Sequence, residues 1–256
     1  MIAKTAIIDP NAKIEEGVKI GHYSIVGPGV EIGQGCEIGN HVTLEGPMKI
    51  GKNNRIFHHS YVGGTPQDLS YNNEKTWVTI GDNNIIREYV TIHRATDKQD
   101  KVTYVGNSNF IMAYVHIAHD CSIGDNCILA NAINMAGHVT IEDYASIGGM
   151  VAIHQFVRIG RYSFVGGFTA VTQDVLPFSM IAGERAVLRG INKVGLQRWG
   201  FDGNARNKLQ KVMRYLMTGE FSTPTAIDNL IKEYPDDPEV KAIIDFIGMS
   251  KRGITR

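Results

Sequence analysis

Two histidines and a carboxylate lie close together in the middle of the chain, at His116, His119 and Asp120. An imidazole has an ordinary pKa of about 6.5, so near neutral pH it can take a proton from a hydroxyl group and later return it. A carboxylate beside such a base can orient its ring. This stretch therefore predicts general base catalysis, with His119 as the base and Asp120 as its support.

The residues around this stretch follow a six-residue period. An aliphatic residue or methionine recurs at every sixth position in three phased runs between Ile8 and Val171. This period suits neither an α-helix nor a hairpin array, and it is typical of a parallel β-helix built from hexapeptides. Three short strands make one triangular coil, so residues 18 apart lie one above another, at the inter-strand spacing of about 4.8 Å. We expect this all-β fold over residues 1–188.

Two polar stretches interrupt the period, at residues 63–79 and 93–104. The first is interpreted as a loop or a distorted coil. The second is expected to be a protruding loop, because the step from Ile92 to Val105 is 13 residues and shifts the register by one. Polar loops on a rigid scaffold commonly carry binding residues, although either stretch can also be an insertion without function.

The repeats fade after Val171, and residues 189–256 are expected to form a small α-helical domain. The first helix should end at Gly219. Such a domain would at least cover the open end of the solenoid. Helix starts are visible at Asp202, at Thr223-Pro224 and at Asp237-Pro238.

The 18-residue coil brings together histidines that are far apart in the sequence. It stacks His119 with Gly137 and Gln155, Asp120 with His138, and Ala118 with His154. These residues and His116 should therefore surround one corner, where Gly137, lacking a side chain, leaves a backbone N–H open to a ligand. By contrast, His22, His41 and His93 are interpreted as ordinary surface histidines.

Two other interpretations remain open for the histidine cluster. His116, His119 and a third histidine such as His138 could bind zinc, as in a hydration enzyme on the same scaffold. The chain could also be a scaffold or trimeric binding protein without catalysis. No compact ligand motif supports a metal, and we expect none. The thiols occupy a small inward position of the repeat and are expected in the core; they belong to Cys36, Cys121 and Cys127.

Composition excludes several other classes of protein. With 26 basic and 26 acidic residues, the chain offers no electrostatic argument for binding nucleic acid or an anionic membrane. The N-terminus lacks the features of a signal peptide, and no apolar run approaches the roughly 18 residues of a spanning helix. An odd number of cysteines without a CxxC pair indicates a reducing compartment. A cytoplasmic protein without stable membrane insertion is expected.

Several segments together carry a resemblance that covers almost the whole chain. The central ones are His116-Ile117-Ala118-His119-Asp120-Cys121, Ala136-Gly137-His138-Val139 and His154-Gln155-Phe156. Others are Pro66-Gln67-Asp68-Leu69, Ile92-His93-Arg94, Gly190-Ile191-Asn192 and Arg252-Gly253. In these segments the chain resembles the family of UDP-N-acetylglucosamine O-acyltransferases that open lipid A synthesis.

The resemblance implies a left-handed β-helix and a homotrimer with sites between subunits. It implies transfer of a (3R)-3-hydroxyacyl chain from acyl carrier protein to the sugar 3-hydroxyl, without a metal, another cofactor or an acyl-enzyme. His119 would be the base, Asp120 its support and Gly137 the oxyanion donor. The implied substrate contacts are His116, His138, His154, Gln155, Gln67 and Asp68, with Asn192 and Arg198 at the nucleotide end. Acyl length would be selected near Gly167 and Arg185.

The chain also departs from the family pattern. Many members have lysine in place of Ser70, glutamate in place of Val194, arginine in place of Trp199 and histidine in place of Arg185. Some relatives use a UDP 3-amino sugar as the acceptor and form an amide. The residues leave open whether the acceptor here is UDP-N-acetylglucosamine or its 3-amino analogue.

Overall fold

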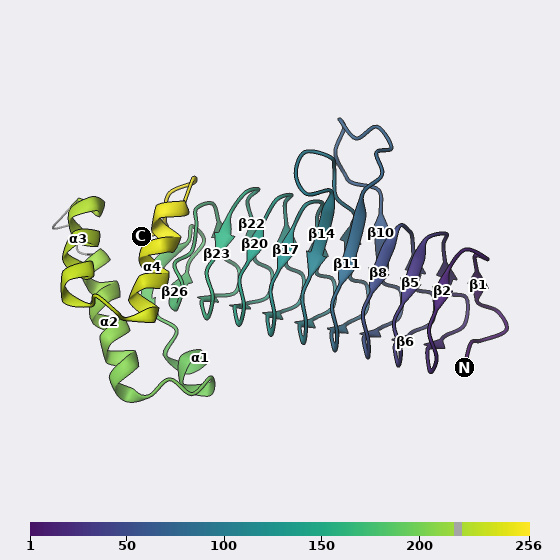
Figure 1. The fold of residues 1–256 in the computed structure, drawn as a ribbon, viewed down its shortest axis with the longest axis horizontal. Helices are drawn as coiled ribbons and strands as arrows, with labels where there is room; N and C mark the ends of the chain where they lie inside the picture. Colours follow the sequence, from purple (N-terminus) through teal and green to yellow (C-terminus); the bar gives the residue numbers. More distant parts are fainter. Residues whose placement is uncertain (218–221) are drawn as a thin grey trace.

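A computed structural model describes residues 1–217 and 222–256 of the chain. Short strands wind into a long three-sided prism, with the N-terminus at one end and a group of helices at the other (Figure 1). The prism is the predicted left-handed parallel β-helix, with the helical region behind it. The aliphatic residues of the six-residue period point inward and form one continuous buried core along the axis.

Three sheets form the sides of the prism, and each takes one strand from every coil. Within the described residues, sheet 1 has nine parallel strands: β1 (Ile7–Ile8), β4 (Ile25–Val26), β7 (Thr43–Leu44), β10 (Tyr61–Gly64), β13 (Thr91–His93), β16 (His116–Ile117), β19 (Asn134–Met135), β22 (Ala152–Ile153) and β25 (Ala170–Val171). Sheet 2 has eight: β2 (Lys13–Ile14), β5 (Val30–Ile32), β8 (Met48–Ile50), β11 (Trp77–Ile80), β14 (Val102–Val105), β17 (Ser122–Ile123), β20 (Thr140–Ile141) and β23 (Arg158–Ile159).

Sheet 3 has ten strands among the described residues: β3 (Lys19–Ile20), β6 (Glu37–Ile38), β9 (Arg55–Ile56), β12 (Ile85–Ile86), β15 (Phe110–Ile111), β18 (Ile128–Leu129), β21 (Ser146–Ile147), β24 (Phe164–Val165), β26 (Ser179–Ala182) and β27 (Val187–Ile191). Its last pair, β26 and β27, is antiparallel, whereas the other strand pairs of the described prism are parallel. The chain therefore turns back on itself where the prism ends.

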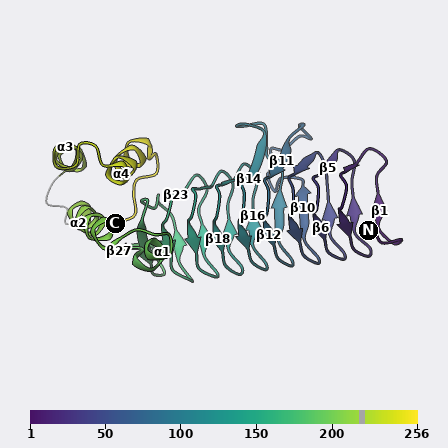
Figure 2. The ribbon, with the colours of Figure 1, turned by 60° about the horizontal axis from the view of Figure 1, so that its bottom comes forward.

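The stacking rule of 18 residues holds along regular coils, where His116 pairs with Asn134 and Asn134 with Ala152. It fails at the two interruptions. Val62 pairs with Ile92, 30 positions later, because residues 65–76 leave the prism as a loop and not as a distorted coil. A second loop, residues 94–101, follows β13. Both loops leave the edge between sheets 1 and 2 and project together from the prism (Figures 1 and 2).

Many corner residues of the prism have a left-handed backbone. Asp120, His138 and Phe156 have φ of 60°, 64° and 65° at the edge between sheets 1 and 2. Because these three residues share one conformation in successive coils, their side chains can stack along the edge. The rings of His138 and Phe156 are nearly parallel, with centroids 4.5 Å apart.

The three cysteines lie in the core, as predicted. Burial raises the pKa of the Cys36 thiol and raises those of Cys121 and Cys127 to about 12. A thiol in this state is a poor metal ligand and nucleophile at neutral pH. The cysteines therefore contribute to packing and not to the chemistry of the neighbouring histidines.

Four helices follow the prism within the described residues: α1 (Lys193–Arg198), α2 (Gly203–Met217), α3 (Thr223–Glu233) and α4 (Pro238–Met249). The predicted starts are confirmed: Asp202 accepts from Ala205 N–H, and Asp237 accepts from Glu239 N–H and Val240 N–H. The predicted end at Gly219 lies outside the described residues. The helices share a second buried core with the end of the prism.

The predicted boundary between residues 188 and 189 falls inside β27, because this antiparallel strand continues sheet 3 to Ile191. The helices start two residues further on, at Lys193. Among the described residues, none of the helices has the length and apolar character needed to cross a membrane.

Candidate active site

A groove runs along sheet 1 beside the edge from which both loops project. It encloses about 590 Å³, within the roughly 300–1,000 Å³ typical of small-molecule sites. Six of the predicted site residues line it: Gln67, His116, His119, Gly137, His154 and Gln155. The coil geometry predicted this convergence for the positions from His116 to Gln155, whereas Gln67 was expected here only from the resemblance.

The pair of His119 and Asp120 lies at the turn between β16 and β17. His119 Nδ1 is 2.8 Å from Asp120 Oδ2. Because a carboxylate only accepts hydrogen bonds, this contact assigns the proton to Nδ1 and leaves the lone pair on Nε2. In its neutral form the ring therefore presents the Nε2 lone pair, which can accept a proton.

Asp120 is held by two threonines that sequence reasoning did not single out. Thr96 donates its hydroxyl to Asp120 Oδ2 at 2.8 Å, and its backbone N–H lies 3.1 Å from the same oxygen. Asp120 N–H donates to Thr103 Oγ1 at 2.9 Å. Burial raises the pKa of Asp120, but hydrogen bonds from His119 and Thr96 outweigh it and hold the pKa below its ordinary value. The carboxylate therefore stays charged at neutral pH.

Gly137 lies directly against the ring of His119, one coil further along. A Cβ atom at residue 137 would be 2.5 Å from His119 Cε1 and 2.8 Å from Nε2. Among the described residues, the Gly137 N–H has no hydrogen-bond acceptor. The missing side chain thus makes room for the imidazole and keeps a backbone donor beside its reactive nitrogen.

Gly137→Ala should lower kcat by about 10²-fold or more, because the new methyl group would push the His119 ring out of its position. Steady-state kinetics of the purified variant would measure this loss. Gly149→Ala is the control, since a Cβ there would be no closer than 3.2 Å to its nearest neighbour, Asn131 O. Equal kcat for wild type and Gly137→Ala would contradict the close contact.

His138 faces the same carboxylate from the next turn. Its Nε2 is 3.8 Å from Asp120 Oδ2, and its Nδ1 lies 2.7 Å from Gln99 Oε1. The amide oxygen of Gln99 is an acceptor, so Nδ1 carries a proton. Burial lowers the pKa of His138, and the charge of Asp120 opposes this effect only in part. Gln99 lies in the aperiodic loop 94–101, where the sequence carries no signal for this contact.

The structure contradicts the interpretation of His93 as an ordinary surface histidine. Only 6% of it is exposed, and its ring meets that of His116 edge to face, with centroids 5.2 Å apart. Burial and the nearby charges of His116 and His119 lower the pKa of His93 to about 4. The hexapeptide phase carries no signal for this burial, because a residue that follows an inward-pointing one such as Ile92 ordinarily faces outward. His22 and His41 are exposed, as expected.

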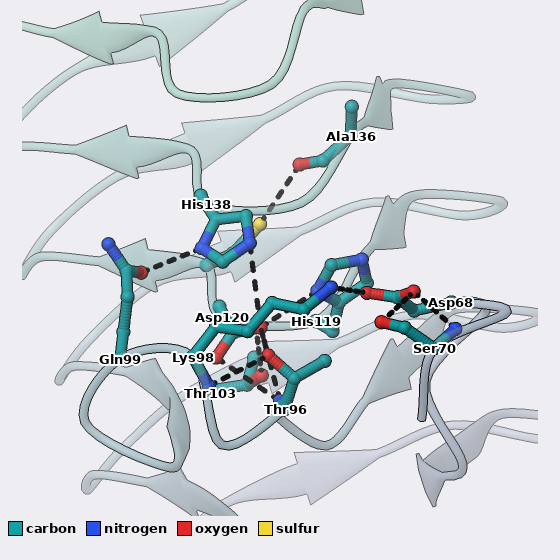
Figure 3. A network of polar contacts seen from close by, with 11 residues as sticks. Asp68, Ser70, Thr96, Lys98, Gln99, Thr103, His119, Asp120, Ala136 and His138 are labelled. Carbon is teal, nitrogen blue, oxygen red and sulfur yellow. Dashed lines mark hydrogen bonds and ion pairs between the residues drawn. The ribbon is translucent and has the colours of Figure 1, made fainter. Parts of the chain in front are cut away.

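An ion pair joins the two loops beside His119 (Figure 3). Lys98 Nζ lies 2.6 Å from Asp68 Oδ2, and Ser70 donates its hydroxyl and N–H to Asp68 Oδ1. The Lys98 ammonium and then Ser70 hold the pKa of Asp68 well below its usual range. Lys98 thus supplies a cation next to Ser70, since both side chains contact the Asp68 carboxylate.

The remaining predicted residues do not line this groove within one chain. Asn192 is buried and caps α1, accepting from Gly195 N–H and donating to Tyr162 O. Arg198 is exposed at the end of α1. The backbone of Arg185 forms a single β-bridge with Ala170, which belongs to the last coil that lines the groove. Gly167 lies in the turn before Ala170, between β24 and β25.

The geometry also brings together a possible metal-binding set. Ligand atoms of His119, Asp120 and His138 lie within 4.8 Å of one another. However, an ion on His119 Nδ1 and Asp120 Oδ2 would have to displace the hydrogen bond between these two atoms.

Two protein-family models match the chain. The model described as Udp N-acetylglucosamine O-acyltransferase, domain 2, matches residues 174–255. The model of the bacterial transferase hexapeptide, with six repeats, matches residues 2–46 and 103–131. The helical end and the prism are thus matched separately.

Relatives and solved structures match the chain along its length. Proteins named acyl-[acyl-carrier-protein]–UDP-N-acetylglucosamine O-acyltransferase from Thermodesulfovibrio yellowstonii and Burkholderia ambifaria are each 52% identical, over 255 and 259 residues, covering 100% of this chain and 99% of the relative. The crystal structure of the UDP-N-acetylglucosamine acyltransferase of Francisella novicida has a TM-score of 0.97 at 40% identity, covering 100% of this chain and 94% of that one. The O-acyltransferase of Moraxella catarrhalis has the same TM-score and identity, covering 100% and 99%.

Proposed function

Because this chain belongs to the acyl-[acyl-carrier-protein]–UDP-N-acetylglucosamine O-acyltransferase family, we infer that it is an acyltransferase acting on acyl carrier protein and UDP-N-acetylglucosamine. The reaction is the first step of lipid A synthesis. The acyl chain that the family resemblance implies is a (3R)-3-hydroxyacyl group, and the acceptor is the 3-hydroxyl of the sugar. The observation that supports this chemistry is the oriented His119 with Gly137 against its ring.

In the proposed mechanism, His119 Nε2 takes the proton of the acceptor hydroxyl while the hydroxyl oxygen attacks the thioester carbonyl. The ring can do this because Asp120 fixes the Nδ1–H tautomer and stabilises the imidazolium that forms. The carbonyl oxygen then carries a negative charge, and the N–H of Gly137 is its proposed donor. When the carbon–sulfur bond breaks, the thiolate of the carrier's prosthetic group leaves and takes the proton from His119.

The proposed substrate contacts surround this centre. His116, His138, His154 and Gln155 line or adjoin the groove, and Gln67 and Asp68 come from the loop above it. Burial, and then the charge of His119, lowers the pKa of His116, so this histidine meets the substrate neutral.

The acyl chain is proposed to run along sheet 1 towards the C-terminal end. Ala152 and Ala170 line the groove in that direction, and their small side chains leave space for an alkyl chain. Arg185 pairs with Ala170 at the end of this path, which supports its proposed role in chain-length selection. Gly167 is proposed to act with it from the neighbouring turn.

The proposed assembly is a homotrimer in the cytoplasm. Asn192 and Arg198 lie beyond the groove in their own chain, so their proposed role at the nucleotide end requires that a neighbouring subunit supply them. No metal or other cofactor is proposed, because the chemistry assigned to His119 and Gly137 needs only the thioester as a co-substrate.

The test is an acyl-transfer assay on the purified protein, with UDP-N-acetylglucosamine and its 3-amino analogue offered side by side. Carrier-bound 3-hydroxyacyl chains of several lengths are supplied, with and without a metal chelator. We expect ester formation on UDP-N-acetylglucosamine that the chelator does not change. Exclusive amide formation on the amino sugar would correct the acceptor. Loss of transfer on chelation would favour a metal enzyme that uses His119, Asp120 and His138.

A further inference from the structure

We propose that Thr96 is a positioning residue for catalysis, acting on His119 through the Asp120 carboxylate. The inference rests on the proposed function, since it concerns the orientation of the base in that reaction. It assigns a task in catalysis to loop 94–101, which projects from the edge of the prism (Figure 1).

The first support is the geometry of the contact. Thr96 is 1% exposed, and its hydroxyl donates to Asp120 Oδ2 at 2.8 Å. Its backbone N–H lies 3.1 Å from Oδ2 and 3.2 Å from Oδ1, so one residue offers two donors to the carboxylate. Buried polar groups that are paired in this way have one well-defined orientation.

The second support is the choice of oxygen. Asp120 Oδ2, which takes the Thr96 hydroxyl, also accepts the proton on His119 Nδ1. Thr103 holds the other end of the same residue by accepting from Asp120 N–H. With its backbone and its carboxylate both fixed, Asp120 can hold the imidazole in only one plane. Figure 3 shows Thr96 and Thr103 on the side of Asp120 away from the groove residue Ala136.

The third support is electrostatic. The side chain of Asp120 is 1% exposed, and the charged or titratable groups around it are His119 and His138 from the turns, the buried Cys121 next to it in the chain, and Lys98 from the loop. Burial raises the pKa of Asp120, and the hydrogen bonds from His119 and Thr96 lower it by more. Removing the Thr96 hydroxyl should therefore move the pKa of Asp120 upward. Protonated Asp120 would accept only weakly from Nδ1 and would no longer stabilise the imidazolium by its charge, so activity would be lost at a higher pH than in wild type.

The experiment compares Thr96→Val, which keeps the shape and loses the hydroxyl, with Thr96→Ser, which keeps the hydroxyl. For Thr96→Val we expect kcat to fall by about 10–100-fold with little change in KM, as for loss of a hydrogen bond to a charged group. The acidic limb of its pH–rate profile should move to higher pH. Thr96→Ser should restore most of the activity and the wild-type profile.

The matched control is Thr76→Val in the neighbouring loop. Thr76 is also fully buried, and among the described residues its hydroxyl has no hydrogen-bond partner. This variant controls for the loss of a buried hydroxyl as such, and thermal unfolding of all variants controls for folding. If active wild-type enzyme and Thr96→Val share the same kcat and pH profile, Thr96 has no positioning role. An equal loss of kcat in Thr96→Ser and Thr96→Val would also contradict the positioning role of the Thr96 hydroxyl. Inactive wild type would instead refute the proposed function.

Discussion

Replacing His119 by alanine should lower kcat by about 10²–10⁴-fold, the usual contribution of a general base, while the protein stays folded. The His119 ring lies between Asp120 on one side and Gly137 on the other, and this arrangement sets the orientation of Nε2. His138 also approaches Asp120, but its Nδ1 already bonds Gln99 and its Nε2 is 3.8 Å from the carboxylate. Single-turnover kinetics with saturating substrates would measure the chemical step directly.

The control for this variant is His22→Ala. His22 is an exposed histidine near the N-terminal end of the prism, with Thr5 as its hydrogen-bond partner. Both variants should unfold at about the wild-type denaturant concentration, because neither side chain belongs to the apolar core. A His119→Ala protein with near-normal turnover would remove His119 as the base.

Asp120→Asn should have an effect of similar size, with a loss in kcat of about 10³–10⁴-fold. The amide has the same shape, but it presents an NH₂ group as well as an oxygen to the donors His119 and Thr96. The imidazole would then carry its proton on Nε2, where it cannot accept one from the hydroxyl. Steady-state kcat and a nitrogen-15 spectrum of the histidine rings would report the activity and the tautomer.

Asp125→Asn is the matched control for that substitution. Asp125 also lies in a turn of the prism, where its Oδ1 accepts from Asn107 N–H at 2.7 Å, and asparagine can keep this bond. Its activity should be unchanged. Full activity in Asp120→Asn, with the Nδ1–H tautomer retained, would show that the backbone alone orients His119.

The sequence predicted the part of the site that lies on regular coils. The hexapeptide has a fixed length, so the stacking of Gly137 on His119 follows from counting 18 residues, and the coordinates confirm it. The convergence of His116, His154 and Gln155 on one groove follows from the same period. These contacts are local consequences of the repeat and need no knowledge of the loops.

The contacts made by the loops could not be predicted in the same way. Thr96, Lys98 and Gln99 contact Asp120, Asp68 and His138, but their separations of 24, 30 and 39 residues are not multiples of the 18-residue coil. An aperiodic segment has no register, so the partner of each side chain depends on the loop conformation. The burial of His93 was not predicted for a related reason: His93 lies where the six-residue period stops, so the period does not fix its surroundings.

The antiparallel turn at the C-terminal end limits how these molecules can assemble. A stack of parallel strands could in principle extend into a fibre, because the last coil of one molecule offers free edges to the first coil of the next. At the N-terminal end, β1 is an edge strand and Ile7 is 64% exposed. At the other end, β27 reverses direction at the edge of sheet 3 and α2 packs against it. The last strands of sheets 1 and 2 are met by single bridges from Arg185 to Ala170 and from Val175 to Ile159, so regular parallel pairing ends there. Head-to-tail growth requires one free end of each kind, and blocking a single end therefore stops polymerisation.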